Sequence, residues 1–592
     1  MRFRALPFAL ALTAFVPTLG ERTAHACGGT FCDGPTPQQP IPMPVRQSGE
    51  NIVFALDGQT VEVHIQIQYT GDPRRFGWVV PLQKAPTSIT VGSQALFTNL
   101  LAGTVPTFQL TSSFDSCNNS SSQPASSGGF GCGAGSSDSS QATDAAGTFN
   151  GTGGSSASGG GPGNVDVTTK RVGAFEVDLL TGGTAQAVTQ WLTDNGYQLN
   201  SAADPIIAKY IDEGYVFAAV KLNAGESTKE IHPIVFRYPG NEPCVPLRLT
   251  SVAAEPTMGI RAFFLGDDRV VPKSYKHVTV SESAYDWTLP NPGQSYEQAV
   301  GRAVSAPTAD GHAFVTDYYG PSSVVSTQGF AQPYWNGAAF ANAAPEDVLN
   351  ILANQGLGVS CPSGGCTSTH PLVLPLLEKW LPAPAGVSEG AFYACVGCYK
   401  AKLVPGKWDP AGFAKDFDER IVAPGNHALD LLARWPSVTR LYTTMSPELM
   451  TEDPTFVAQP GLPRVSPAHV ATSRTTCDGR QGIELADGSH VYNPSSPQAK
   501  WPPFDTPIPA AAKVEDYSGP SGGVVVADNS GAIGKPIDSW NTAASWPPPA
   551  QFRDDRSSSC TMGRPRNTNL AVALGLLGFA GLLRRVTRRR QR

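Results

Sequence analysis

The sequence predicts an α+β protein: an antiparallel β-rich domain with inserted helices, then a more helical, disulfide-braced region and a Pro-rich spacer. The first observation is the stretch Val61 to Tyr69, in which apolar and polar residues alternate with a period of two, as in a strand with one face in water. The second is the placement of helix-start signals, such as Thr184 and Asp204-Pro205, between groups of strand-like runs. The third is the crowding of prolines beyond residue 494.

Local signals place the elements of the first domain in order. Ile52 to Leu56 forms a strand, Asp57-Gly58 turns the chain, and the alternating strand follows. His64 falls on the polar face of that strand, where we expect a solvated side chain. Phe76 to Leu82 is a further strand, and later strands are expected at residues 215–222, 231–238, 245–253, 260–266 and 275–281.

Residues 112–164 are rich in Ser and Gly and contain no Lys or Arg. Such a composition buries too little apolar area to offset the entropy lost on ordering the chain. We therefore expect a disordered insertion within a domain that spans residues 27–282. Beyond it we expect a mixed helical and strand region at 283–493, with helices at 346–354, 371–380, 410–419 and 427–434, and a Pro-rich spacer at 494–559.

The amino-terminal segment has the parts of a secretory signal. Arg2 and Arg4 precede a mostly apolar run from Ala5 to Leu19, and Ala24-His25-Ala26 fits a small-residue cleavage site. We expect a signal peptide at residues 1–26 that is removed before Cys27. The alternative is a lipoprotein signal with Cys27 as the first mature residue, but polar residues separate the apolar run from that cysteine.

The carboxy-terminal segment, residues 560–592, combines a lone cysteine, a short apolar run and an arginine-rich end. Cys560 stands before residues 570–583, for which we expect a short transmembrane helix. That helix spans about 21 Å at ~1.5 Å per residue, less than a hydrocarbon core of ~30 Å. The tail resembles the myxobacterial sorting signal called myxo-CTERM, which implies a temporary membrane stop, cleavage by a sorting protease near Cys560, and a lipid on that cysteine. A plain membrane anchor is the alternative.

The net charge argues against one class of partner. Lys and Arg total 43 and Asp and Glu total 49; without the two terminal segments these totals fall by eleven and by one, so a net charge of −6 becomes −16. Nucleic-acid binding needs a cationic surface, so we expect no nucleic-acid partner. The expected partners are a membrane, through the tail or its lipid, a sorting protease, and a surface ligand of unknown identity.

Ten of the 11 cysteines remain when Cys560 is set aside, and an even number in an exported chain indicates disulfides. Proximity along the chain favours four local pairs and leaves Cys244 and Cys477 to pair over a long range. The local pairs are Cys27–Cys32, Cys117–Cys132, Cys361–Cys366 and Cys395–Cys398.

The last two local pairs also have the spacing of metal ligands. Cys361-x4-Cys366 followed by Cys395-x2-Cys398 resembles two zinc knuckles, and the second pair alone has the spacing of a redox motif. An oxidising compartment favours disulfides, and the strand-to-helix setting of a redox motif is not evident. We therefore expect no metal and no cofactor, with zinc as the alternative at these four cysteines.

Candidate catalytic patterns are weak. Gly386 to Gly390 matches the G-x-S-x-G elbow, but the preceding prolines predict a loop where the elbow needs a buried strand. Asp267-Asp268 and the run Asp416 to Glu419 offer paired carboxylates of the kind that hydrolyse glycosides, yet short acidic clusters are usually solvated. No catalytic residue is predicted. Five histidines without ligand spacing are expected to be structural or solvated: His232, His277, His312, His370 and His427.

Several strings resemble a secreted bacterial family called domain of unknown function 2330. They are residues 26–32, 52–58, 63–72, 76–81, 191–197 and 246–250, with a weaker match at 441–465. The resemblance covers about residues 27–320 and implies a secreted protein. The family brings no known activity, so it supplies no catalytic residues.

Two functions from different classes fit these observations. The first is an exported envelope protein that is anchored at the cell surface or outer membrane, after passage through the inner membrane, and serves as a binding or structural module. The second is a secreted hydrolase that acts on polysaccharide or peptide. The terminal signals, spacer and disulfides favour the first function, because no catalytic constellation accompanies them.

Overall fold

The first hairpin of the chain joins strand β1 (Arg46–Leu56) to β2 (Thr60–Thr70) through the predicted Asp57-Gly58 turn. Gly58 has a φ of 66°, which favours glycine. The structure is a computed structural model, which describes residues 46–70, 76–115, 164–197, 201–223, 226, 228–362, 365–494, 500–520 and 522–547. Its fold is α+β, as the sequence predicts.

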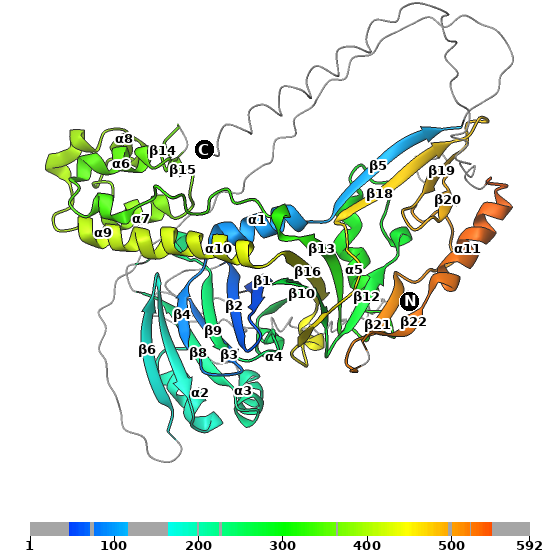
Figure 1. Ribbon diagram of the computed structural model, residues 1–592, viewed down its shortest axis with the longest axis horizontal. Helices are drawn as coiled ribbons and strands as arrows, with labels where there is room; N and C mark the ends of the chain where they lie inside the picture. The colour runs from blue at the N-terminus through cyan, green and yellow to red at the C-terminus, as the bar shows by residue number, and fades with distance from the viewer. Residues whose placement is uncertain are drawn as a thin grey trace, which may run out of the picture. The chain divides into compact units, whose positions relative to one another are not determined.

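The hairpin belongs to a ten-stranded sheet with the strand order β22-β21-β12-β13-β16-β10-β1-β2-β9-β4. β1 pairs in parallel with β10, and β12 pairs in parallel with β13. Strands from distant parts of the chain therefore share one sheet (Figure 1). Its other members are β4 (Ser88–Val91), β9 (Ile234–Pro239), β10 (Ala254–Gly266), β12 (Lys276–Val280), β13 (Ala313–Pro321), β16 (Ser437–Met445), β21 (Ala511–Asp516) and β22 (Val524–Asp528).

A four-stranded antiparallel sheet shares the main core with the large sheet. Its strands, in the order β3-β8-β7-β6, are β3 (Gly77–Leu82), β8 (Val216–Leu222), β7 (Phe175–Thr181) and β6 (Asp166–Val172). Apolar residues at alternate positions, such as Val63 of β2 and Val80 of β3, belong to this one buried cluster. The polar face of β2 points away from it.

Helices cover the outer faces of both sheets. α2 (Ala185–Asp194) and α3 (Ala203–Asp212) share a buried cluster with the four-stranded sheet. α1 (Gln94–Thr104) and α10 (Ala423–Arg434) share another with the far face of the large sheet, which includes Phe97, Phe263 and Leu431. Thr184 caps α2, as predicted. This half of the fold is therefore layered α/β/β/α.

Residues 245–253, expected as a strand, instead contain the short helix α4 (Leu247–Thr250). Pro246 precedes it and has no backbone N–H for a strand ladder. Asp453 accepts a hydrogen bond from the Arg248 backbone N–H at 2.9 Å and another from its guanidinium at 3.0 Å. Contacts with a residue 205 positions away therefore override the local strand preference.

The helical region that follows has its own core. Its helices are α6 (Val348–Asn354), α7 (Val373–Trp380), α8 (Glu389–Ala394) and α9 (Pro410–Phe417), and they enclose Phe340, Leu377 and Phe413. A π turn, η9 (Asp418–Val422), joins α9 directly to α10. The sequence predicts two separate helices here, at 410–419 and 427–434, but the π turn continues the first into the second.

A third sheet and several short elements complete the described chain. The sheet has the order β20-β19-β18-β5, with β18 and β5 parallel. A turn at Asp487-Gly488 joins β19 to β20. The strands of this sheet are β5 (Thr107–Phe114), β18 (Ala468–Thr475), β19 (Gln481–Glu484) and β20 (His490–Tyr492). The remaining elements are the pairs β11 (Arg269–Pro272) with β17 (Phe456–Gln459) and β14 (Val359–Ser360) with β15 (Thr367–Ser368), and the helices α5 (Tyr296–Val304) and α11 (Ser530–Ala543).

Two expected boundaries differ from the structure. Residues 494–559 were expected as a spacer, yet β21, β22 and α11 lie within them, because Val514 pairs with β12 and Ile533 enters a buried cluster. The boundary at 282/283 does not divide the fold, since β12 and β13 pair across it within one unit that extends to Trp546.

Several expectations fall on residues that the structure does not describe. The signal peptide at 1–26 and the sorting tail at 560–592, with its expected helix at 570–583, lie outside the described residues. So do residues 116–163 of the expected insertion, whereas 112–114 form the end of β5. Within the described ranges, no helix is long and apolar enough to cross a bilayer.

Candidate functional site

Three ionisable side chains meet where strand β2 passes beneath helix α10. Glu62 and His64 are two residues apart on β2 and therefore point to the same face, opposite the apolar residues of the main core. His427 comes from α10, whose Ala428 and Leu431 pack into the cluster on that same side of the sheet. The fold thus joins two residues that are 365 positions apart, Glu62 and His427.

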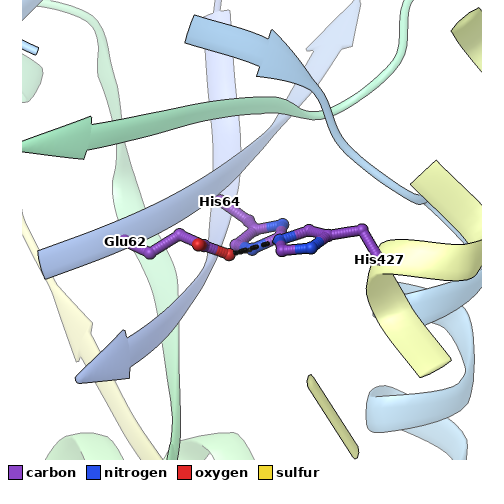
Figure 2. Close-up of side chains that lie close together, drawn as sticks. All are labelled: Glu62, His64 and His427. Atoms are coloured by element: carbon purple, nitrogen blue, oxygen red, sulfur yellow. Dashed lines mark hydrogen bonds and ion pairs between the residues drawn. The ribbon is translucent and has the colours of Figure 1, made fainter. Parts of the chain in front are cut away.

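One carboxylate oxygen of Glu62 contacts both imidazoles. Glu62 Oε1 is 2.8 Å from His64 Nε2 and 2.6 Å from His427 Nε2. The two rings are nearly parallel, with an interplanar angle of 9° and centroids 5.7 Å apart. Both rings converge on the carboxylate in Figure 2. One potential ligand atom from each residue lies within 4.8 Å of the other two.

The prediction that His64 is solvated is wrong. Its relative exposure is 1%, because α10 covers the polar face of β2. His64 Nδ1 makes no hydrogen bond to the described part of the chain. A buried polar atom without a hydrogen-bond partner lowers the free energy of unfolding by about 1–3 kcal/mol. Such an atom in a native structure calls for an explanation, such as a ligand or a catalytic role.

The three groups differ in their protonation. Burial raises the pKa of Glu62, but hydrogen bonds from His427 and His64 outweigh burial and hold that pKa well below its usual range. Burial lowers the pKa of His64, against the opposing effect of Glu62. The hydrogen bond to Glu62 raises the pKa of His427. The site is thus a carboxylate held between a buried histidine whose pKa is lowered and a partly exposed histidine whose pKa is raised.

A cavity of about 520 Å³ opens beside Glu62 and His427. Strands β4 and β9, the end of β6 and the start of α10 enclose it. This volume lies in the range of small-molecule sites. The apolar part of its wall includes Ile89, Val91, Val172, Val235 and Pro424, and the ionisable part consists of Glu62, Lys170, Arg171, Arg237, Glu419 and His427.

Arg237 holds the outer side of the Glu62 carboxylate. Its guanidinium is 3.0 Å from Asp57 Oδ2 and 3.8 Å from Glu62 Oε2. Oε1 of Glu62 is therefore left to the two histidines. A smaller hollow of about 90 Å³ borders Glu62, Arg237 and His427, so two hollows touch the cluster.

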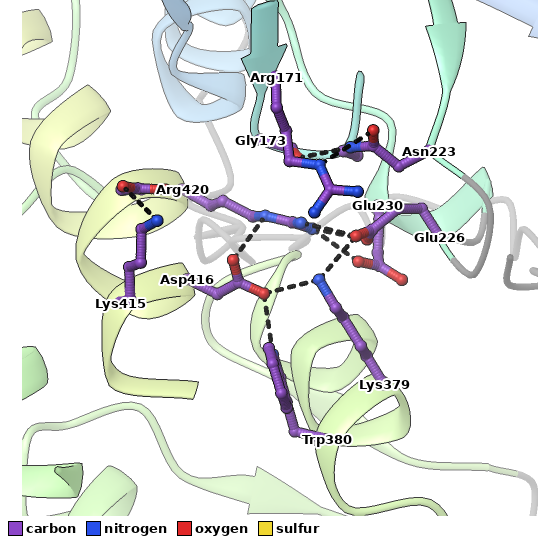
Figure 3. A network of polar contacts seen from close by, with 12 residues as sticks. Arg171, Gly173, Asn223, Glu226, Glu230, Lys379, Trp380, Lys415, Asp416 and Arg420 are labelled. Carbon is purple, nitrogen blue, oxygen red and sulfur yellow. Dashed lines mark hydrogen bonds and ion pairs between the residues drawn. The ribbon is translucent and has the colours of Figure 1, made fainter. Parts of the chain in front are cut away.

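A second polar cluster anchors the start of α10 (Figure 3). Arg420 in the π turn is 3% exposed and pairs with Glu226 at 2.9 Å and Glu230 at 2.6 Å. Lys379 of α7 pairs with Glu226 at 2.6 Å and with Asp416 at 2.7 Å. Arg420 precedes His427 by seven residues, about two helical turns. The cluster therefore fixes α10, and with it His427, over β2.

The two buried glutamates of this cluster have opposite pKa shifts. Glu226, Glu230 and Asp416 face the two cations of Arg420 and Lys379. Burial and the neighbouring Glu226 raise the pKa of Glu230 to about 8. Burial also disfavours ionised Glu226, but hydrogen bonds from Glu230 and Arg420 lower its pKa to about 2. The glutamate pair therefore holds one proton at neutral pH.

The structure bears out two of the predicted cysteine pairs and overturns the long-range one. Cys361–Cys366 and Cys395–Cys398 are disulfides, so their sulfurs are not thiolate ligands for zinc in this structure. Cys244 is a buried free thiol, and Cys477 is disulfide-bonded, so the expected Cys244–Cys477 bridge is wrong. The other predicted cysteines, Cys27, Cys32, Cys117, Cys132 and Cys560, lie outside the described residues.

The catalytic-looking motifs have ordinary structural roles. Ser388 caps α8 by accepting a hydrogen bond from the Ala391 backbone N–H, and Asp267 lies in an exposed turn. Asp416 is not solvated as expected, since it accepts a hydrogen bond from Trp380 Nε1 at 2.8 Å and pairs with Lys379. A wider hollow, of about 1010 Å³ beside Trp287, has no ionisable side chain in its wall.

Sequence reasoning missed the Glu62–His64–His427 cluster. The available signal was Glu-x-His on one face of a strand, which places two ligand-type side chains side by side. The third member comes from a helix far along the chain, and no spacing rule links it to β2. The sequence analysis expected His427 to be structural or solvated, as it did His232. His232 is indeed structural, since it accepts a hydrogen bond from the Ala174 backbone N–H at 3.0 Å.

Comparisons with known proteins identify one family, whose model covers more than half of the chain and ends before α10. The family model described as "Uncharacterized protein conserved in bacteria (DUF2330)" matches residues 23–344. No curated protein matches the chain. A solved structure, a mutated baculovirus P35 after caspase cleavage, is 11% identical over 44% of this chain and 73% of that chain, with a TM-score of 0.19. A likeness at that TM-score carries no argument about fold or function.

Proposed function

The chain belongs to the DUF2330 family of uncharacterised bacterial proteins, and we propose that it is an exported binding protein of the cell envelope. The export signal at residues 1–26 and the sorting tail at 560–592 support the location. In this proposal a sorting protease cuts near Cys560, and a lipid on that cysteine holds the acidic body at the cell surface. The alternative of a secreted hydrolase has weaker support, because Ser388 of the G-x-S-x-G match caps a helix.

The cavity of about 520 Å³ beside α10 is the observation that carries the binding role. Much of its wall is apolar, which favours a ligand with a hydrocarbon part. Lys170, Arg171 and Arg237 border it, against the acidic Glu62 and Glu419. The basic side chains at the cavity outnumber the acidic ones, which favours an anionic group on the ligand. The proposed ligand is therefore a small amphipathic carboxylate or a molecule of similar chemistry.

The test measures binding of octanoate to the full-length chain by isothermal titration calorimetry. Ala423 is exposed and borders the cavity, so Ala423→Trp fills the cavity from its solvent side without disturbing the core. The control is Ala353→Trp, at an exposed helix position that does not border the cavity. We expect saturable binding of octanoate, weak or no binding of 1-octanol or acetate, and a loss of at least about 10-fold in Ala423→Trp alone. Absence of saturable octanoate binding, or equal binding by both variants, would contradict the proposal.

A further inference from the structure

We propose that Glu62, His64 and His427 form a binding site for one divalent transition-metal ion of the zinc class. Two imidazole nitrogens and one carboxylate oxygen are the donors that such ions accept from proteins. In the described chain these atoms already lie within 4.8 Å of one another. Three protein ligands leave at least one coordination position for water or another ligand.

The hydrogen-bonded arrangement needs little movement to accept an ion. Metal–ligand distances of about 2.0–2.2 Å place adjacent ligand atoms roughly 3–3.5 Å apart. The measured separations from Glu62 Oε1 are 2.8 Å to His64 Nε2 and 2.6 Å to His427 Nε2. Each contact therefore opens by less than about 1 Å. An entering ion replaces the ring proton at each Nε2, and that proton moves to Nδ1 or leaves to solvent.

The contacts of Glu62 leave one of its carboxylate oxygens to an ion. Arg237 lies 3.8 Å from Glu62 Oε2, whereas both histidines contact Oε1, so Oε1 is the ligand atom. His427 is 38% exposed, so the ion has a route in from solvent.

An ion at this site would also present its open position to the cavity. Glu62 and His427 both border the cavity of about 520 Å³. The anionic group of a ligand in that cavity would complete the coordination of the ion, while its hydrocarbon part lies against Ile89 and Val235. This last step rests on the proposed binding function. The metal site itself rests only on the three donor side chains and their geometry.

The test titrates Zn²⁺ into the full-length chain, prepared without a histidine tag, and follows binding by calorimetry. The key variant is His427→Gln, because His427 is only partly buried and its loss leaves the packing of α10 intact. The matched control is His312→Gln, another partly exposed histidine, which contacts Thr451 and lies apart from the cluster. Glu62→Gln provides a second ligand variant that preserves the size of the side chain. The melting temperatures of all variants are compared to confirm folding.

We expect one equivalent of Zn²⁺ to bind saturably, Mg²⁺ to show no binding, and both His427→Gln and Glu62→Gln to weaken Zn²⁺ by at least about 100-fold. Loss of a direct ligand should exceed the 10–100-fold effect of losing an outer partner. His312→Gln should bind as the unmodified chain does. Failure of Zn²⁺ to bind, or equal affinity in folded His427→Gln, would overturn the metal site. Octanoate binding is measured separately in metal-free buffer, so either proposal can fail alone.

Discussion

At the residue scale, Glu230 is one of the buried groups that link the stability of this protein to pH. Its pKa is raised to about 8 by burial and by the neighbouring Glu226, against 4.5 for an ordinary glutamate. The folded chain therefore holds this proton more tightly than the unfolded chain does. The stabilisation is fully present below about pH 4.5 and is lost as the pH rises through about 8.

We accordingly predict that this part of the free energy of unfolding, on the order of a few kcal/mol, disappears between pH 5 and pH 8. Glu230→Gln should remove most of that slope, because an amide does not titrate. Glu389→Gln, at an exposed helix start, should keep it. Urea unfolding at several pH values measures the effect. An unchanged slope in Glu230→Gln would show that the shared proton is not what links stability to pH.

The residue scale also shows where sequence reasoning ends. The period-two pattern of β2 was sufficient to place Glu62 and His64 on the face opposite the main core. It did not reveal that α10 covers this face, because covering depends on packing between segments far apart in sequence. Cys244 shows the same limit. The local pairing of the other cysteines left it to pair with Cys477, but it is a buried free thiol.

At the element scale, the π turn and α10 form one continuous helical segment, which the ion pairs of Arg420 anchor. Removing this guanidinium takes away a cation that Glu226 and Glu230 both contact. We predict that Arg420→Met destabilises the chain by about 3–5 kcal/mol, the usual cost of breaking a buried ion pair from one side. Lys415→Ala, which removes an exposed pair with Glu419, should change stability by less than about 0.5 kcal/mol. Chemical denaturation compares the two variants.

The same anchor should affect the site at a distance, because α10 carries His427. In Arg420→Met, hydrogen–deuterium exchange of residues 423–434 should rise more than exchange of α2, which packs elsewhere. Equal exchange in α10 before and after the substitution would show that the packing of Ala428 and Leu431 alone holds the helix.

Element boundaries were the least predictable part of the fold. Turns and caps were found where the signal is local, as at Asp57-Gly58 and Thr184. The continuous run from Pro410 to Arg434 was predicted as two helices, at 410–419 and 427–434. The π turn that joins them leaves no pattern in the sequence.

At the scale of the whole molecule, the folded body extends well past the point where prolines begin to crowd. β21 pairs with β12, and α11 contributes Ile533 and Ile537 to a buried cluster with Val491. Composition alone suggested a spacer at 494–559, since prolines are frequent in spacers. In the structure many of these prolines flank the strands and α11, although Pro536 lies inside the helix.

We predict that a chain ending at residue 494 melts at least about 10 °C lower than a chain ending at residue 547, because the first has lost β21, β22 and α11. Both truncations remove the expected tail, so the comparison isolates the folded elements. Differential scanning calorimetry measures the difference. Equal melting temperatures would mean that residues 500–547 add nothing to the stability of the body.

Strand β2 and helix α10 together form the proposed metal site. Zinc K-edge X-ray absorption of the full-length chain with one equivalent of Zn²⁺ reports the ligands of the bound ion. We predict nitrogen and oxygen neighbours at about 2.0–2.1 Å, the multiple scattering of two imidazoles, and loss of one imidazole in His427→Gln. A shell of sulfur at about 2.3 Å, or a shell without imidazole, would place the zinc elsewhere and contradict the proposed site.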